Sequence, residues 1–146
     1  MSAVKGLADL NRRASLLSRD IATKIGQSAN RAGTKEIADA IRTEATDGPT
    51  PEGEVRNRRR KSGKTVQEPH KKIKNHIRVV KVRAKDGVVE NAVVIDAYHA
   101  GMEEFGSIHN TPNPFAKRGF DKARNDAIEK VKKVLERRIA KEEAKL

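Results

Sequence analysis

The segment YHAGMEEFGSIHNTPNPFAKRGF, residues 98–120, joins a predicted sheet to a predicted helix and contains every aromatic residue of the chain. These residues are Tyr98, Phe105, Phe115 and Phe120. A buried ring removes on the order of 150 to 250 Å² from water, so the four rings are expected to supply much of a small core. Gly101, Gly106 and two prolines divide the segment into a helical turn, a tight corner and an extended linker. A shape this constrained is also typical of a docking surface.

On the C-terminal side of this segment, residues 114–146 predict one long helix. Apolar residues recur at steps of three and four from Phe120 to Ile139, and charges of both signs occupy the other faces. Pro114 fits the first turn of the helix, and Asn113 before it is a suitable N-cap. The helix is expected to be about seven turns long.

On the N-terminal side, residues 73–96 predict a β-hairpin that leads into residues 97–113, the motif and its linker. The β-branched runs KIKNHIRVVKVRA and VVENAVVID flank Asp86-Gly87, which is a strong turn signal. In the first run the apolar positions change parity near Val79, which predicts a bulge or a change of buried face there. The second run is more continuously apolar and predicts a central strand rather than an edge strand.

The first third of the chain, residues 1–47, predicts one or two amphipathic helices, because its aliphatic residues recur mostly at steps of three and four. Each glycine inside a helix costs about 1 kcal/mol relative to alanine, so a break or a kink is expected between Gly26 and Gly33. Thr34 is then a candidate cap for the second piece. The helical pattern stops at TDGPTPEGE, where Gly48 suits a left-handed C-terminal position.

Residues 48–72 contain almost no aliphatic side chain and predict a long exposed loop or arm. Taken together, these elements predict a single α+β domain over residues 1–146. An N-terminal helix or helix pair and a long C-terminal helix pack on a small antiparallel sheet, and a long basic loop projects from it.

The formal net charge of the chain is +12, and the excess of positive charge is local. Residues 56–85 hold thirteen lysines and arginines against the single Glu68, and the rest of the chain is neutral overall. Such a cluster contacts nucleic-acid phosphates, docks on an acidic protein surface or is simply solvated, and the pattern leaves these three interpretations open. The candidate contact residues are Arg56, Arg58, Arg59, Arg60, Lys61, Lys64, Lys71 and Lys72.

Nothing in the sequence predicts an enzyme. The chain has no cysteine, and its four histidines lack the spacing of metal ligands. Glu103 and Glu104 are neighbours, so on a helix they point in different directions and do not form an acid–base pair. We therefore expect no catalytic residue, no metal, no cofactor and no small-molecule substrate. No apolar run approaches the roughly 18 residues that a membrane span needs, and a protein made in the cytoplasm without membrane contact is expected.

The stretch YHAGMEEFGSIHNTPNPFAKRGFDKA, residues 98–123, resembles the small tail-completion or neck proteins of long-tailed bacteriophages. In that family a helical turn containing Tyr and Ala leads to Glu-Phe-Gly, a short linker, Pro-Phe and a long C-terminal helix, and the order of elements agrees over nearly the whole chain. The matching residues are Tyr98, Glu104, Phe105, Gly106, Pro114 and Phe115. The chain departs from the family pattern at residues 48–77, where its loop is longer and more basic.

The resemblance implies a structural virion protein of the head–tail junction, a homo-oligomeric ring that joins the connector to the tail around a DNA channel. On this interpretation Tyr98, Phe105 and Phe115 pack the corner and orient the terminal helix. Glu103 and Glu104 then face an adjacent subunit or the next ring, and the basic arm lines the channel or reaches an acidic neighbour. The alternative hypothesis is a stand-alone basic protein that binds double-stranded nucleic acid.

Overall fold

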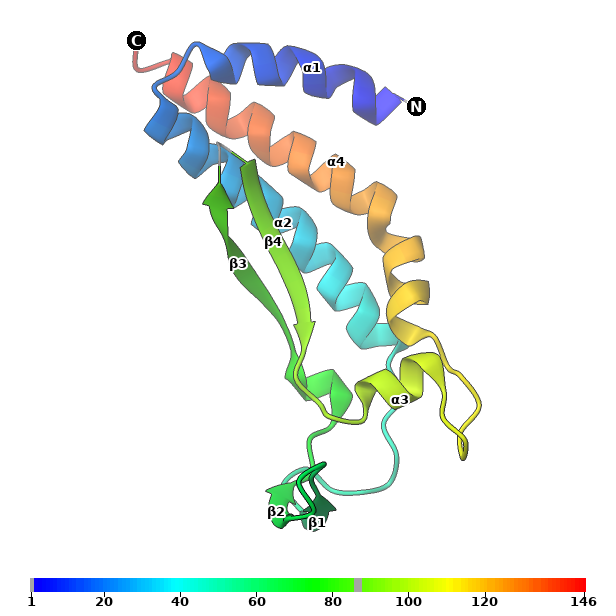
Figure 1. Ribbon diagram of the computed structural model, residues 1–146. Coiled ribbons are helices and arrows are strands. Elements are labelled where there is room, and N and C mark those ends of the chain that lie inside the picture. The colour runs from blue at the N-terminus through cyan, green and yellow to red at the C-terminus, as the bar shows by residue number, and fades with distance from the viewer. Residues whose placement is uncertain (1, 86–87) are drawn as a thin grey trace.

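Four α-helices and two antiparallel hairpins make up residues 2–85 and 88–146, which are the residues that the computed structural model describes (Figure 1). The helices are α1 (Ser2–Ser15), α2 (Arg19–Glu44), α3 (Ala100–Phe105) and α4 (Phe115–Glu143). The strands are β1 (Val55–Arg59), β2 (Thr65–Pro69), β3 (Ile77–Lys85) and β4 (Val88–Ile95), and η1 (Ile73–His76) is a short 3-10 helix. The predicted α+β class is confirmed.

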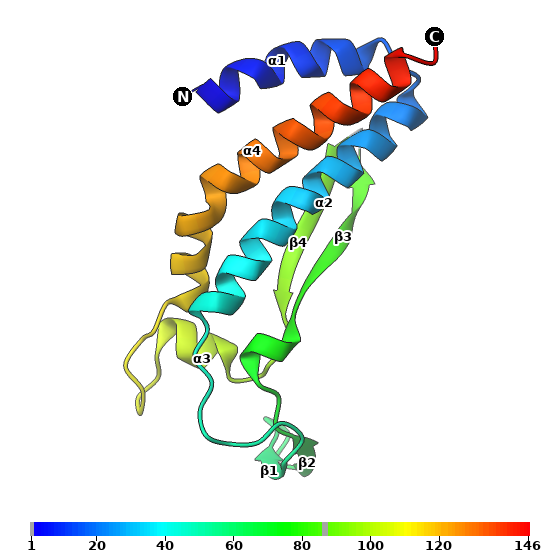
Figure 2. The ribbon, with the colours of Figure 1, turned by 180° about the vertical axis from the view of Figure 1, so that it is seen from behind.

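The long helices α2 and α4 lie side by side and form the frame of the molecule (Figures 1 and 2). Two glycines permit their close approach. A Cβ atom on Gly33 would lie 2.5 Å from Cγ2 of Val131 and 2.9 Å from the carbonyl oxygen of Ala127. A Cβ atom on Gly119 would lie 2.6 Å from Cα of Ile41. Carbon atoms in contact are normally about 3.5 to 4.0 Å apart, so any side chain at these positions would push the helices away from each other.

The break in the N-terminal helical region lies at residues 16–18, and of the predicted break or kink between the two glycines, the break is wrong because α2 is continuous there. Ser18 caps α2 by accepting a backbone N–H of the first turn on its side-chain oxygen, at 3.4 Å. Gly33 stays inside α2 because it faces α4, where its lack of a side chain is required. Thr34 caps nothing, since its hydroxyl donates to the carbonyl oxygen of Asn30 at 2.8 Å.

Helix α2 ends at Glu44, earlier than Gly48 indicated. Ala45 is extended, with ψ of 132°, and donates its N–H to the carbonyl of Ile41 at 2.9 Å. In the described residues the glycines with positive φ are Gly53, Gly63 and Gly106. The prediction of a left-handed Gly48 is therefore wrong.

Strands β3 and β4 form the predicted antiparallel hairpin. Its ladder is irregular between Val82 and Lys85 rather than near Val79, and η1 takes the place of the expected start of the first strand. Among the described residues, the sheet that contains β4 consists of β3 and β4 only, so β4 is an edge strand. The prediction of a central strand is therefore wrong for the single chain. The Asp86-Gly87 turn lies outside the described residues.

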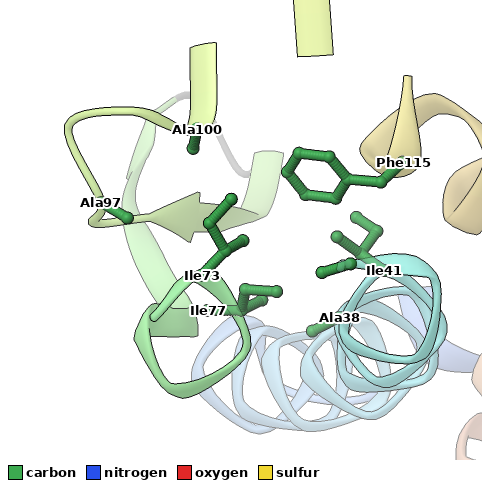
Figure 3. Close-up of a cluster of buried hydrophobic side chains, with 8 residues drawn as sticks. Ala38, Ile41, Ile73, Ile77, Ala97, Ala100 and Phe115 are labelled. Carbon is green, nitrogen blue, oxygen red and sulfur yellow. The ribbon is translucent and has the colours of Figure 1, made fainter. Parts of the chain in front are cut away.

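Helix α2 covers one face of the β3–β4 hairpin, and α4 lies on the other side of α2 (Figures 1 and 2). The main core forms where α2, η1, the end of β4 and the start of α4 meet, and Phe115 and Ile73 are its fully buried large side chains (Figure 3). A smaller cluster of Leu10, Ile25 and Ile139 joins α1, α2 and α4. In the described part of the chain no helix has a stretch apolar enough to cross a bilayer.

The basic segment is a hairpin, and the prediction of a loop over residues 48–72 is corrected. Strands β1 and β2 pair in register, and all five residues of β1 are exposed, so the predicted exposure holds although the predicted loop does not. Gly63, with φ of 83°, donates its N–H to the carbonyl of Arg60 at 2.9 Å. Arg60 in turn donates its N–H to the carbonyl of Lys64 at 2.8 Å. Glycine supplies the left-handed conformation that closes this turn.

Candidate functional site

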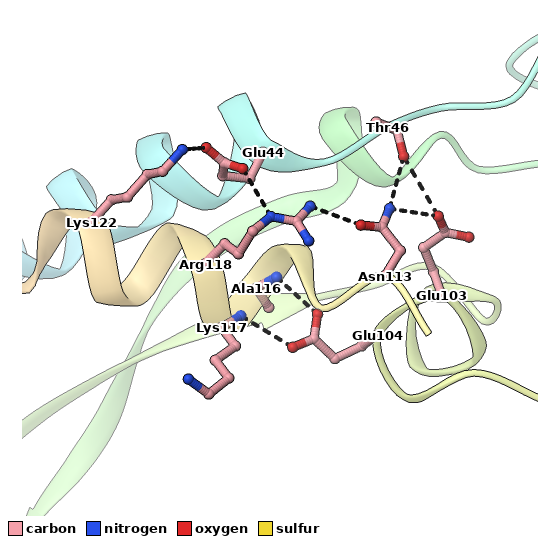
Figure 4. A network of polar contacts seen from close by, with 9 residues as sticks. All are labelled: Glu44, Thr46, Glu103, Glu104, Asn113, Ala116, Lys117, Arg118 and Lys122. Carbon is pink, nitrogen blue, oxygen red and sulfur yellow. Dashed lines mark hydrogen bonds and ion pairs between the residues drawn. The ribbon is translucent and has the colours of Figure 1, made fainter. Parts of the chain in front are cut away.

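The acidic residue of the Glu-Phe-Gly motif caps the last helix. The Glu104 carboxylate accepts the backbone N–H of Ala116 at 2.8 Å and that of Lys117 at 3.1 Å (Figure 4). Pro114 stands at the N-cap of α4 and makes no side-chain capping bond, so the predicted cap by Asn113 is wrong by one residue. The first N–H groups of a helix lack partners and carry partial positive charge, and a carboxylate satisfies both needs. Glu104 therefore fixes the start of α4 against α3.

Glu103 and Asn113 tie the corner to the end of α2. Asn113 donates twice to Glu103: its side-chain amide donates to the Glu103 carboxylate at 3.0 Å, and its backbone N–H donates to the Glu103 carbonyl at 2.7 Å. Asn113 accepts from Arg118 at 2.8 Å, and Arg118 donates to Glu44 at 3.1 Å (Figure 4). Two hydrogen bonds lower the pKa of Glu44 below its ordinary value; the bond from Lys122 has the larger effect and the bond from Arg118 the next. Both carboxylates that were expected to face a neighbouring subunit therefore bond within their own chain.

Gly106 makes the sharp corner that the sequence predicts. Its φ of 77° lies in the left-handed region, and a Cβ atom there would lie 2.7 Å from Cγ of Pro112. Ser107 and Asn110 then close a small turn, since each donates its N–H to the other's carbonyl, at 2.9 and 3.3 Å. The loop between α3 and α4 is therefore held by its own backbone bonds.

The four rings divide between core and surface. Phe115 is fully buried, as expected, but 81% of Phe105 is exposed, and 44% of Tyr98 and 46% of Phe120 are exposed. The prediction that Phe105 and Tyr98 pack the corner is wrong. The six-residue helix α3 turns Ala100 inward, and Phe105 lies on its outer side.

Met102, Phe105 and Ile108 are exposed apolar residues of α3 and of the loop after it, and we call the three the α3 knob. Their exposed fractions are 43%, 81% and 94%. The knob sits on a corner held by the Glu104 cap and by the left-handed Gly106. Its side chains contribute little to burial in the subunit, so they are available to a partner.

The basic hairpin is attached to the corner by an arginine. The Arg58 guanidinium lies 5.0 Å from the centre of the Tyr98 ring and donates to Glu68 at 3.0 Å. Arg60 lies 3.7 Å from the same carboxylate. The hydrogen bond from Arg58 lowers the pKa of Glu68. Cations over aromatic rings attract the ring's negative face, so Tyr98 serves to position the hairpin.

The eight predicted contact residues do not form one patch. Arg59, Arg60, Lys61 and Lys64 lie at or beside the exposed tip of the hairpin. Arg58 lies along the hairpin, opposite Val66 and over the Tyr98 ring, and the other three are at its base. Arg56 donates to the Thr50 hydroxyl at 2.6 Å, Lys71 lies 3.5 Å from Asp96, and the backbone N–H of Lys72 donates to Glu52 at 2.7 Å. The tip is therefore the part of the set that offers clustered positive charge to a partner.

The base of the hairpin is held by Glu52. Its carboxylate lies 2.6 Å from Nε2 of His76 and also accepts the Lys72 N–H, and these bonds lower its pKa to about 2, the His76 bond most. Nearby, His70 and His99 stack with ring centres 5.2 Å apart, and burial lowers the pKa of His99. Within residues 2–85 and 88–146 no group of three His, Asp or Glu side chains could hold a metal ion.

No protein family, curated protein or solved structure matches this chain. Its function therefore has to be argued from the corner, the hairpins and the charges themselves.

Sequence reasoning missed two surface features. A groove of about 730 Å³ lies between α1, α2 and the start of β4, with Leu7, Ala14, Ala22, Val89 and Leu135 in its walls. The face of the β3–β4 hairpin that points away from α2 also carries apolar side chains. The change of apolar parity near Val79 and the continuous apolar run of β4 were the sequence signals for this second feature.

Proposed function

We propose that this chain is a structural virion protein of the head–tail junction of a long-tailed bacteriophage, a tail-completion or neck protein. Copies of it form a homo-oligomeric ring that joins the connector to the tail around the DNA channel. The proposal starts from the resemblance carried by Tyr98, Glu104, Phe105, Gly106, Pro114 and Phe115.

The observation that carries the proposal is that the three residues of the Glu-Phe-Gly motif have different environments: the outer two fix the corner and the middle one is exposed. Glu104 caps α4 and Gly106 adopts a left-handed conformation, so the two outer residues build a rigid corner. The residue between them, Phe105, is 81% exposed on that corner. A large ring that a rigid frame holds in solvent contributes nothing to the stability of its own chain. A contact with another protein surface explains it, since aromatic anchors dominate such contacts.

The decisive experiment removes this protein from assembling particles. A nonsense mutation in its gene should leave filled heads and finished tails that do not join, as seen by electron microscopy. Adding the purified protein to that lysate should restore joined, infectious particles. Joined particles without the protein would refute the proposal.

A second candidate function, binding of double-stranded nucleic acid by the isolated protein, is favoured by the basic tip. Fluorescence anisotropy with a short duplex measures it between about 50 and 200 mM salt. Each lost phosphate contact reduces the salt slope by about 0.9. A Lys61→Gln/Lys64→Gln variant should therefore reduce the slope by about 2. A Lys133→Gln/Lys141→Gln variant removes the same charge from exposed positions of α4 and should leave the slope unchanged.

Tight duplex binding by a monomer, together with normal head–tail joining in its absence, would favour this second candidate. Weak binding outside an assembled ring is what the head–tail proposal expects.

A further inference from the structure

The two faces of the β3–β4 hairpin differ in what covers them. Ile77 and Val79 on β3, with Val93 and Ile95 opposite them on β4, pack in the main core beside α2. Successive side chains of a strand point to opposite faces, so the alternate residues lie on the other side. We call that side the outward face; it carries the apolar residues Val80, Val82, Val88, Ala92 and Val94, with Arg78 opposite Val94 and Glu90 opposite Val82.

Apart from Arg78 and Glu90, the outward face has the composition of a buried surface. Strands that are apolar on both faces are found where both faces are covered, whereas a strand with one wet face alternates apolar and polar residues. In Figures 1 and 2, α2 covers one face of this hairpin only. Val88 is 55% exposed. A two-stranded sheet is also marginal in water by itself, and both of its edges present unpaired backbone groups.

The α3 knob is another uncovered apolar surface of the described residues. Helix α3 and the loop after it carry the knob and lie at the end of the frame where α4 begins. The β3–β4 hairpin lies on the opposite side of α2 from α4 (Figures 1 and 2). One chain therefore cannot bring its own knob to its own outward face.

We propose that the α3 knob of one copy packs on the outward face of the β3–β4 hairpin of a second copy. Contact between two different surfaces on opposite sides of a subunit is heterologous, and repetition of such a contact closes a ring when the rotation permits. The inference rests on the proposed ring and names the interface between its subunits.

The segments that carry the two surfaces have opposite net charge. Glu103 and Glu104 also bond within their own chain, and Arg78 and Glu90 balance each other on the outward face itself. Residues 98–112, which carry the knob, contain Glu103 and Glu104 and no lysine or arginine. Residues 77–95, which carry the outward face, contain four basic residues and two acidic ones. Opposite charge favours the encounter of these surfaces over contact between two knobs or between two outward faces.

The first test compares matched variants by analytical ultracentrifugation. Phe105 and Leu16 are both 81% exposed, so serine at either position removes a similar exposed apolar side chain. Phe105→Ser should raise the dissociation constant of the oligomer at least about tenfold, as loss of an aromatic anchor does. Leu16→Ser, on the α1–α2 connection, should leave it unchanged. Equal assembly by the two variants would overturn the inference.

The outward face has its own matched pair. Val88 on β4 and Val55 on β1 are 55% and 62% exposed, so glutamate at either position is tolerated by the subunit fold. Val88→Glu should weaken assembly about tenfold, and Val55→Glu should not. Val80→Glu places the same charge at the middle of the face, and its melting temperature shows whether the subunit has stayed folded. Assembly of the folded Val80→Glu variant at wild-type strength would count against the inference.

Mixing the variants separates this interface from a symmetric one. Phe105→Ser keeps an intact outward face, and Val80→Glu keeps an intact knob. If the contact is heterologous, the mixture should form a one-to-one dimer and stop there, because each partner then has no good surface left. A mixture that stays monomeric, or one that forms full rings, would contradict the inference.

Because the chain has no cysteine, engineered cysteines report the contact directly. Under oxidation, Ile108→Cys mixed with Val80→Cys should give a disulfide-linked dimer. Ile108→Cys mixed with Ala22→Cys, in the groove beside α1, should not. Crosslinking to the groove instead of the outward face would assign the knob to a different surface.

Failure of this inference is distinguishable from failure of the proposed function. If wild-type rings form and head–tail joining requires the protein, but Phe105→Ser assembles normally, the interface is wrong and the function stands. If the wild-type protein is monomeric at millimolar concentration and joining proceeds without it, both are wrong.

Discussion

Replacement of Gly119 by alanine tests the packing of the α2–α4 frame. A Cβ atom at this position would lie 2.6 Å from Cα, 2.7 Å from N and 2.8 Å from Cγ1 of Ile41. Two of these atoms belong to the backbone of α2, so a side-chain rotation cannot relieve the overlap. The helices must separate beside the core that contains Phe115.

The expected magnitude is the difference between two effects. Alanine is favoured over glycine inside a helix by about 1 kcal/mol. Overpacking costs about 1 to 3 kcal/mol, and the upper end applies here because backbone atoms collide. Gly119→Ala should therefore lower the free energy of unfolding by about 2 kcal/mol. For a domain of this size, that corresponds to a melting temperature about 6 to 8 °C lower.

The matched control is the same substitution in an open place. A Cβ atom on Gly101 in α3 would meet no atom within 4 Å. Gly101→Ala should therefore raise the unfolding free energy by up to about 0.5 kcal/mol, the opposite sign. Urea unfolding followed by circular dichroism measures both variants. If Gly119→Ala stabilises the protein as Gly101→Ala does, the close contact between α2 and α4 is refuted.

Three further predictions concern the corner and the base of the basic hairpin. Phe115→Ala should cost about 3 to 5 kcal/mol because its ring is fully buried, whereas Phe105→Ala should change stability by less than about 0.5 kcal/mol in urea unfolding. Glu104→Gln should cost about 1 kcal/mol in thermal unfolding, because the cap of α4 loses its charge. Glu52 has a pKa of about 2, below its ordinary 4.5, so its contribution to stability is present above pH 4.5 and is lost as the pH falls toward 2. Melting temperatures of the wild type and Glu52→Gln should therefore differ at pH 5 and converge near pH 2.

Each of these predictions can fail clearly. Equal losses for the two phenylalanine variants would show that Phe105 is buried. Unchanged melting of Glu104→Gln would show that the start of α4 does not depend on this cap. A constant difference between the wild type and Glu52→Gln from pH 5 to pH 2 would show that the bond to His76 does not hold this carboxylate ionised.

The elements that bury a regular stripe could be predicted from the sequence. Helix α4 follows from a period of 3.6 residues, and the β3–β4 hairpin follows from two β-branched runs on either side of a turn signal; together they fix the α+β class. The β1–β2 hairpin could not be found in this way. Its strands are polar and exposed, so no burial imposes alternation on them, and the glycine of its turn was the available signal.

Glycine positions show a second limit of sequence reasoning. A glycine within a helical pattern usually indicates a break, but Gly33 and Gly119 lie inside helices, at points where two helices come close. A broken helix and a closely packed one both require glycine. The partner helix decides between them, and it is far away in the sequence.

The aromatic segment shows why the corner was only partly predicted. The positions of Gly106 and Phe115 indicated a turn and a core residue, and the structure confirms both. The cap of α4 by Glu104 was not predicted, since Asn113 was expected in that role. Whether Phe105 faces in or out depends on where α3 starts, because one helical residue changes the direction of a side chain by about 100°. The sequence does not define that start to within one residue.

The two features that a single chain leaves unexplained are those that the proposed interface uses. The continuous apolar run of β4 indicates a strand with both faces covered, yet α2 covers only one of them. Phe105 has the size of a core residue and is 81% exposed. Neither feature increases the stability of the isolated subunit, and exposed apolar surface carries a cost in aggregation. If the knob of one copy covers the outward face of the next, a single contact accounts for both, and the pattern that misled the single-chain prediction describes the strand's environment in the ring.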